Sequence, residues 1–334
     1  KKKKKKMDGK ELPMNLRDDN LTEKTKTLIS SLPSDKDSLG KLCNYQGCWY
    51  YYNTLQGVLS FQRDFKPQDN DTILASLPKS GTTWLKALTI ALLERSKNRS
   101  SDDLHPLQSD NPHGLVPFLE EFYLQSSKPD STKLPSSSPR LFSTHMPLHT
   151  LQLAFKEHSS CKIVYVCRNV KDVLVSHWYF RCANIKVEGE RNLLESMFES
   201  FCSGVSYYGP FWEHVLSYWR ESLEVPNHVL FMRYEEMKAD PRAQIKKLAD
   251  FLGCPFTEEE EESGSVNKIL ELCSLRSLSG LEINKTGKTW NKVHHCSYFR
   301  KGQVGDWKNH LTREMENKID KIIEDKLQGS GLKF

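Results

Sequence analysis

The chain has 334 residues, 37% hydrophobic and 27% charged, a composition typical of a folded globular protein and unlike that of a disordered or fibrous one. The formal charge of +5 includes Lys1–Lys6, which precede Met7; without them 42 basic residues stand against 43 acidic ones, and charge does not favour a nucleic-acid-binding surface. No apolar run reaches the roughly 20 residues of a membrane span, and the N-terminus lacks the apolar stretch of a secretory signal, so we expect a cytosolic protein.

The N-terminal region and the cysteines set two further expectations. We interpret residues 1–20 as a disordered leader or N-terminal extension, and residues 21–334 as one domain. The nine cysteines are scattered, with no Cys-x-x-Cys pair and no histidine at zinc-ligand spacing. This pattern predicts reduced thiols and no metal site.

A dense aromatic group, Asn44–Tyr52, is the first distinctive segment. One interpretation is a flap packed over the core. The other is a wall of an apolar ligand pocket, because binding sites also concentrate aromatic side chains.

Strand patterns alternate with helical patterns from Asp71 onward. Asp71–Leu77 is a short apolar run, and a glycine-containing turn joins it to a helical pattern over Trp84–Leu93. This alternation predicts an α/β fold: a single domain with a mostly parallel central sheet flanked by helices. Further strands are expected over Arg140–Thr144, Lys162–Cys167 and Val229–Tyr234, and further helices over Leu21–Leu32, Lys171–Phe180, Pro241–Leu252, Glu258–Glu262 and Arg313–Leu327.

The turn Pro78–Trp84 has the features of a P-loop-like phosphate-binding turn. It lies between the carboxyl end of a strand and the N-terminus of a helix, where doubly wound sheets bind anions. The backbone N–H groups and nearby hydroxyls can surround phosphate oxygens, while Lys79 supplies a positive charge. Because Lys79 precedes Gly81, the turn is not the G-x-x-x-x-G-K-[ST] form, which weakens an NTPase or kinase interpretation. An ordinary strand-to-helix turn is the alternative.

Two more polar residues follow strands. His145 comes directly after Arg140–Thr144, and Arg168 after Lys162–Cys167, with Ser176 two helical turns further on. A parallel sheet would bring Lys79, His145 and Arg168 to one edge. Alone, His145 could be a structural histidine and Arg168 a surface ion-pair partner.

Arg300–Trp307 combines two cations with two glycines, whose backbone can closely approach an anion. A basic surface turn is the alternative.

With this segment, three motifs resemble those of the cytosolic sulfotransferases, in the same order: Pro78–Trp84, Cys167–Ser176 and Arg300–Lys308. The resemblance extends from about Leu21 to Phe334. Tyr45–Trp49 and Gly329–Phe334 resemble the plant branch, whose acceptors include flavonols, brassinosteroids, hydroxyjasmonate and desulfoglucosinolates.

The resemblance implies a donor, 3′-phosphoadenosine 5′-phosphosulfate (PAPS), whose sulfonate passes to an acceptor hydroxyl and leaves 3′-phosphoadenosine 5′-phosphate (PAP). It implies that His145 is the catalytic base and that Lys79 is a second catalytic residue. The implied donor-binding residues are Lys79, Ser80, Gly81, Thr82, Thr83 and Trp84 for the 5′-phosphosulfate and adenine, Arg168, Ser176, Arg300, Lys301 and Gly302 for the 3′-phosphate, and Tyr234, Cys273, Ser274 and Leu275 for the adenosine.

The chemistry of these residue types agrees with those roles. An imidazole can take a proton from an acceptor hydroxyl, and Lys79 can neutralise the charge that develops on the bridging oxygen. No metal is needed for this chemistry.

The sequence departs from the family at Leu275, where the family usually has Phe, and at Lys308–Asn317, which keeps only the Lys and Thr of the animal dimer motif. We therefore expect a monomer or a weak dimer.

Two other functions stay open. One is a P-loop small-molecule kinase, and the other is a catalytically silent nucleotide-binding module. The expected acceptor is a small apolar molecule of flavonol, brassinosteroid or hydroxyjasmonate type. Its pocket-wall candidates are Trp49, Phe118, Phe122, Tyr179 and Tyr207, together with Tyr50 and Tyr208.

Overall fold

The computed structural model describes residues 12–37, 39–95, 104–125, 139–155, 161–185 and 191–334, without the side chains of residues 153–155 and 185. Most of the leader expected over residues 1–20, residues 1–11, therefore lies outside the described part.

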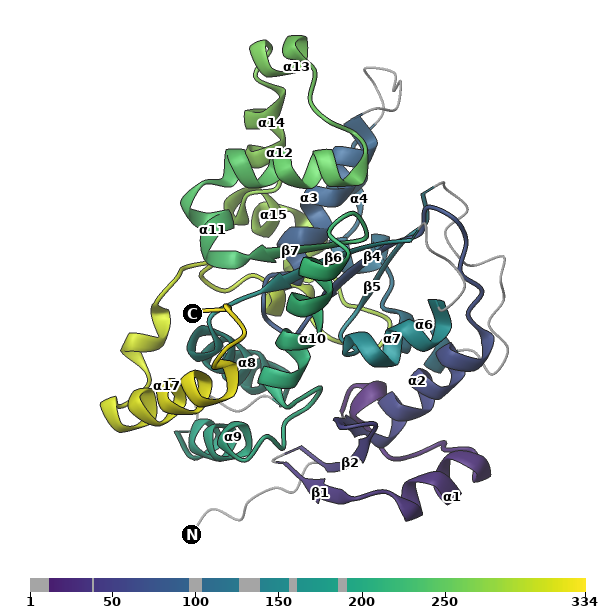
Figure 1. Ribbon diagram of the computed structural model, residues 1–334. Helices are drawn as coiled ribbons and strands as arrows, with labels where there is room; N and C mark the ends of the chain where they lie inside the picture. Colours follow the sequence, from purple (N-terminus) through teal and green to yellow (C-terminus); the bar gives the residue numbers. More distant parts are fainter. Residues whose placement is uncertain (1–11, 38, 96–103, 126–138, 156–160, 186–190) are drawn as a thin grey trace.

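A four-stranded sheet crosses the centre of the molecule, in the strand order β5-β4-β6-β7 (Figure 1). Each of its three pairings is parallel, as the sequence predicts. All five residues of β4 are buried, as expected for an inner strand covered on both faces. The strands are β4 (Thr72–Ser76), β5 (Leu141–Thr144), β6 (Lys162–Cys167) and β7 (Val229–Arg233).

Helices cover both faces of the sheet because alternate strand residues point to opposite sides. Leu74 and Val164 belong to one buried cluster, and Ile73 and Tyr165 belong to another. The first cluster packs under α3 (Thr82–Arg95), α12 (Pro241–Leu252) and α14 (Ser265–Leu272); the second packs under α2 (Tyr52–Asp64), α6 (Leu119–Gln125), α7 (Leu148–Phe155), α8 (Val170–Ile185) and α10 (Phe211–Glu224) (Figure 1).

A small antiparallel sheet precedes this core, with the order β1-β2-β3. Its strands are β1 (Ser34–Lys36), β2 (Lys41–Tyr45) and β3 (Cys48–Tyr51). The other elements are η2 (Met14–Leu16), α1 (Glu23–Ser31), α4 (Pro106–Ser109), α5 (Pro112–Leu115), α9 (Arg191–Cys202), α11 (Tyr234–Ala239), α13 (Glu258–Glu262), α15 (Leu275–Gly280), α16 (Glu282–Thr286), η4 (His295–Tyr298), η5 (Asp306–Asn309) and α17 (Arg313–Leu327). Among the described helices, none is both long and apolar enough to cross a membrane.

The aromatic segment is part of the core. Tyr50 and Tyr51 are fully buried, and Tyr50 belongs to the cluster beneath the main sheet. Tyr51 donates its hydroxyl proton to the carboxylate of Asp37, which also pairs with Arg181 of α8 at 2.8 Å. The packed-flap interpretation therefore describes this hairpin, which the buried ion pair holds against α8.

The described part of the expected N-terminal extension differs from that expectation. Asn15 is buried, and its backbone carbonyl accepts a hydrogen bond from Thr54 Oγ1 at 2.7 Å. Its side-chain amide donates to Glu121 and to the hydroxyl of Tyr207. The segment around Asn15 is thus packed on the domain, because this buried asparagine bonds polar groups of three other segments.

Local helix signals match the structure closely. The helix after Pro241 spans Pro241–Leu252, and α13 begins with the capping box expected between Thr257 and Glu260. The helix after the phosphate-binding turn starts two residues earlier than the expected Trp84, at Thr82. Thr82 and Thr83 therefore belong to its first turn, and the Thr82 hydroxyl bonds to Ser76 at the end of β4.

Candidate active site

The turn after β4 has a strained, tightly packed backbone. Lys79 and Gly81 have φ angles of 71° and 115°, and the second lies where side chains are disfavoured. A Cβ atom on Gly81 would lie 2.9 Å from Cδ2 of Tyr234. Glycine is required here because the ring of Tyr234 lies directly against the turn. Ser76 and Thr82 share a 2.6 Å hydrogen bond that ties the strand end to the helix start.

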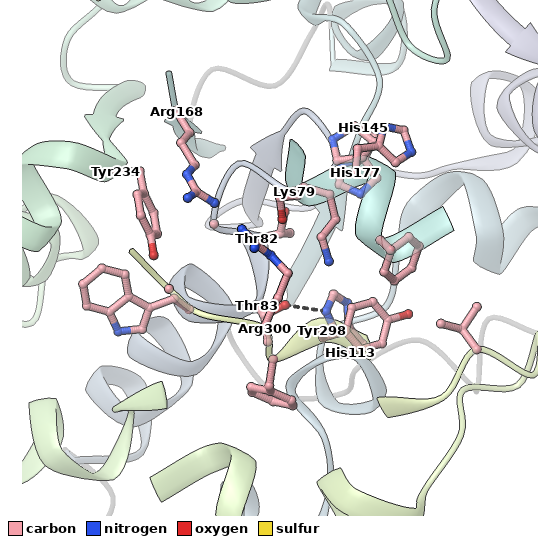
Figure 2. A pocket seen from close by; sticks show the side chains of 18 of the residues that line it. Lys79, Thr82, Thr83, His113, His145, Arg168, His177, Tyr234, Tyr298 and Arg300 are labelled. Carbon is pink, nitrogen blue, oxygen red and sulfur yellow. Dashed lines mark hydrogen bonds between the residues drawn. The ribbon is translucent and has the colours of Figure 1, made fainter. Parts of the chain in front are cut away.

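Residues that follow the four parallel strands line one cavity of about 370 Å³. Lys79 follows β4, His145 follows β5, Arg168 follows β6, and Tyr234 follows β7. Figure 2 shows Arg168 and Tyr234 on one side of Lys79, and His145 on the other. The sequence expects Lys79, His145 and Arg168 at one edge of the sheet, and the structure places them there.

Arg168 is buried at one end of the cavity. Its guanidinium donates to the carbonyl oxygen of Gln303 at 2.7 Å, lies 3.6 Å from the carboxylate of Asp172, and covers the ring of Tyr234 at 4.5 Å. Its Nε is buried and has no hydrogen-bond partner among the described residues. Ser176, two turns along α8, lines the same cavity. This end can accept a further anionic group.

A second set of cations comes from the segment after η4. Asp306 accepts hydrogen bonds from Arg300 at 2.5 Å and from Lys301 at 2.7 Å, and so orients both side chains. Gly302, with a φ angle of 61°, brings the backbone close to Leu275. Cys273, Ser274 and Leu275 line the cavity beside this segment, and Leu275 is 39% exposed. Of the expected donor-site residues, only Ser80 lies outside the described lining; it is buried within the turn.

Lys79 lies near two other cations of the cavity, Arg168 and Arg300. Its Nζ is 4.2 Å from the ring centre of Phe180 and 3.5 Å from the carbonyl oxygen of Ser297. Burial and repulsion from Arg168 and Arg300 lower the pKa of Lys79 to about 7. A bound anion would relieve this repulsion, so the cavity is electrostatically suited to a ligand with several negative charges.

His145 is held with one ring nitrogen as a donor. Its Nδ1 lies 2.6 Å from the carbonyl oxygen of Ser76, and because a carbonyl can only accept, Nδ1 carries the proton. Nε2 therefore keeps its lone pair. Burial lowers the pKa of His145 to about 3, so the ring is neutral near pH 7. The backbone N–H of His145 donates to Glu120 at 2.8 Å, and the ring packs against Phe118 at 4.6 Å.

Sequence reasoning missed a hydrogen-bonded chain beside the turn. Thr83 Oγ1 lies 2.8 Å from Nε2 of His113, as Figure 2 shows, and Nδ1 of His113 lies 3.2 Å from Nζ of Lys86. Lys86 is fully buried and donates to the carbonyl oxygen of Val116 at 2.8 Å. Lys86, a lysine within the apolar pattern of α3, was a sequence signal that could have indicated this chain. The sequence gives no such signal for His113, because only the folded chain brings it to Thr83.

The apolar part of the cavity matches the pocket-wall candidates only partly. Phe118 and Tyr207 line it, whereas Trp49, Phe122 and Tyr179 lie outside the described lining. Trp49 pairs through its backbone with Gly209, Phe122 packs against Tyr123, and Tyr179 stacks beneath Arg300. Tyr50 and Tyr208 are buried in the core and lie outside this lining. Lining residues that the sequence did not suggest include Leu12, Leu39, Glu121, His177, Phe180, Asn291 and Tyr298.

A parallel sheet that carries a phosphate-binding turn and buried cations at its carboxyl edge defines a class of α/β proteins that bind anionic ligands there. Comparison with known proteins gives the family. Residues 69–331 match the model of the sulfotransferase domain, and the chain belongs to the sulfotransferase family. The resemblance seen in the three motifs is thereby confirmed, and the protein is an enzyme of this family.

Individual relatives agree with this assignment. The chain is 68% identical over 327 residues to cytosolic sulfotransferase 1 of Arabidopsis thaliana, covering 97% of this chain and 98% of that protein. A solved structure of a proposed Arabidopsis thaliana steroid sulphotransferase has a TM-score of 0.74 and 43% identity, covering 97% of this chain and 99% of the other. A mouse sulfotransferase in complex with PAP has a TM-score of 0.64 and 26% identity, covering 87% and 95%.

Proposed function

We propose that this sulfotransferase moves the sulfonate group of PAPS to a hydroxyl of a small apolar acceptor, with His145 as the general base. The observation that carries the proposal is the arrangement of His145: a neutral imidazole whose Nδ1–H is bound to Ser76 and whose Nε2 lone pair is available in the cavity that Lys79 also lines. This arrangement disfavours a silent nucleotide-binding module, which would have no use for a base there.

The residues present suit the donor. Three cations, Lys79, Arg168 and Arg300, line one cavity with the phosphate-binding turn, and the Nε atoms of both arginines are buried without a partner among the described residues. The mouse relative was crystallised with PAP, which supports the same nucleotide here. We assign Lys79–Trp84 to the 5′-phosphosulfate, and Arg168 with Ser176 to the 3′-phosphate.

The side chains divide the chemistry between them. When bound, PAPS supplies a sulfonate whose bond to the bridging phosphate oxygen breaks as the acceptor oxygen bonds to sulfur. His145 Nε2 takes the proton of the acceptor hydroxyl. Lys79 in its charged form stabilises the negative charge that develops on the phosphate oxygen, and the site offers this charge without reorganisation because the turn is already formed.

The acceptor binds on the side of the cavity formed by the N-terminal segment and α6. Leu12, Leu16 and Leu39 line it with Phe118 and Phe180, so it suits a largely apolar molecule. Flavonol, brassinosteroid and hydroxyjasmonate types all meet this requirement. The names of the Arabidopsis relatives support a cytosolic location, and we propose a monomer or a weak dimer.

A panel assay tests the proposal. The protein is incubated with sulfate-labelled PAPS and, separately, a flavonol, a brassinosteroid and hydroxyjasmonate, and labelled product is separated from donor. Transfer to at least one acceptor, dependent on His145, is the expected result. PAP binding without turnover of any hydroxylated acceptor would instead favour a silent nucleotide-binding module, and transfer of the γ-phosphate of ATP would favour a kinase.

A further inference from the structure

One acidic side chain interrupts the apolar acceptor side of the cavity. Among the described residues that line the cavity, Glu121 is the only carboxylate. It comes from α6, next to Glu120, and lies beside the amides of Asn15 and Asn291. An apolar pocket with a few placed polar groups usually uses them to orient its ligand.

The two adjacent glutamates of α6 have different surroundings. Glu120 is buried and accepts hydrogen bonds from the His145 backbone at 2.8 Å, from Thr144 at 2.9 Å and from Tyr208 at 3.0 Å. These short contacts give it a structural role: it holds the strand end that carries His145.

Glu121 is bound less closely. Asn15 donates to one of its oxygens and Asn291 to the other, each at 3.4 Å, beyond the usual 2.7–3.2 Å of such bonds. The side chain of Trp290 also forms a hydrogen bond with it. Since a carboxylate offers about four acceptor positions, Glu121 retains capacity for a donor on a ligand.

The charges around Glu121 favour a ligand that donates a hydrogen bond and disfavour a ligand that carries a negative charge. Burial and the nearby Glu120 raise the pKa of Glu121 to about 7, an effect that Lys86 opposes. An O–H donor from the ligand would stabilise the ionised form, whereas a further carboxylate would add to the repulsion.

We propose that Glu121 accepts a hydrogen bond from a second hydroxyl of the acceptor and thereby selects neutral, polyhydroxylated acceptors over those that carry a carboxylate. The inference rests on the proposed sulfonate transfer and refines its acceptor class. Among the three acceptor types, it favours flavonols and brassinosteroids over hydroxyjasmonate.

The first experiment removes the hydrogen bond. Wild type, Glu121→Gln and Glu121→Leu are assayed with a flavonol that carries a second hydroxyl remote from the sulfonated one, and with the analogue that lacks it. Wild type should prefer the hydroxylated flavonol by about tenfold in kcat/KM, as expected for one hydrogen bond to a charged group. Glu121→Leu should reduce the preference to below about threefold, and Glu121→Gln, whose amide oxygen still accepts, should keep part of it.

The second experiment removes the charge. Hydroxyjasmonate is compared with its methyl ester, which has the same hydroxyl but no carboxylate. Wild type should turn over the ester more efficiently than the acid, and Glu121→Gln should narrow this difference because it changes the charge with little change in shape. Glu199→Gln is the matched control, since Glu199 is an exposed glutamate of α9 that pairs with Lys318 on the surface; it should behave like wild type.

PAP titration and thermal melting accompany each variant, and unchanged PAP affinity is expected because Glu121 lies on the acceptor side. The same preferences in wild type and in both Glu121 variants would overturn the assignment of Glu121 and leave sulfonate transfer intact. Failure of wild type to sulfate the four acceptors and a brassinosteroid, with PAP still bound, would overturn the proposed function and this inference with it.

Discussion

Replacement of His145 separates a general base from a structural histidine. His145→Ala removes the Nε2 lone pair that we assign to the acceptor proton. A placed general base contributes about 10²- to 10⁴-fold to rate, so turnover should fall by at least ~10²-fold, or about 2.7 kcal/mol of transition-state stabilisation. PAP affinity should stay near that of wild type, because the cations at other strand ends, to which we assign the nucleotide, are unchanged.

The structural cost of this change can be measured separately. His145→Ala also loses the hydrogen bond to the carbonyl oxygen of Ser76, about 0.5–1.5 kcal/mol, and the ring contact with Phe118. In His145→Asn the side-chain amide can still donate to that carbonyl but offers no basic nitrogen. We expect the Asn variant to melt above the Ala variant and to be equally inactive.

The assay measures kcat at saturating donor with an acceptor that wild type sulfates, beside calorimetric titration with PAP and thermal melting. The decisive comparison is between activity and folding. A folded His145→Asn or His145→Ala protein that binds PAP and keeps more than about a tenth of wild-type turnover would refute the base assignment, because even a modest base contributes ~10²-fold.

Four further predictions concern the donor side of the cavity. Arg168→Ala should weaken PAP binding by about 1.5–3 kcal/mol and leave adenosine 5′-phosphosulfate almost unaffected; equal losses in titrations of both nucleotides would contradict its pairing with the 3′-phosphate. Leu275→Phe, at a position that is 39% exposed, should tighten donor binding by about 0.5–1.5 kcal/mol without changing the acceptor KM, and no tightening would mean that the adenine is held differently. Burial and two guanidinium groups hold the pKa of Lys79 near 7, and a bound anion should raise this pKa. PAP should therefore bind with proton uptake at pH 8, and its affinity should fall as the pH rises above 7. Binding heats at pH 8 that do not depend on the ionisation enthalpy of the buffer would exclude this proton uptake. If His113 orients the hydroxyl of Thr83, His113→Phe and Thr83→Val should each weaken PAP binding, and the double variant should lose less than the sum of the two; strictly additive losses in the double-mutant cycle would show that they act independently.

The sequence by itself determined the four strands of the main sheet, several of the helices, and the order in which polar residues follow the strands. Each depends on local signals: the apolar runs before Lys79, His145 and Arg168, and the capping box of Thr257 and Glu260 that starts one helix. Because parallel strands end at a common edge, those signals were enough to predict that the three side chains would meet.

The tertiary structure alone decided the protonation and hydrogen bonding of those residues and which side chains surround them. Ser76 sets the proton on His145, yet it lies 69 positions away in sequence, and His113 reaches Thr83 from the short helix α5. The acceptor side depends on contacts between Asn15, in the expected leader, and Glu121 of α6. Burial and hydrogen bonding between distant segments create these features, and neither leaves a periodic pattern or a residue spacing in the sequence. The carboxylate of Glu121, which we assign to acceptor selection, could therefore be recognised only in the folded chain.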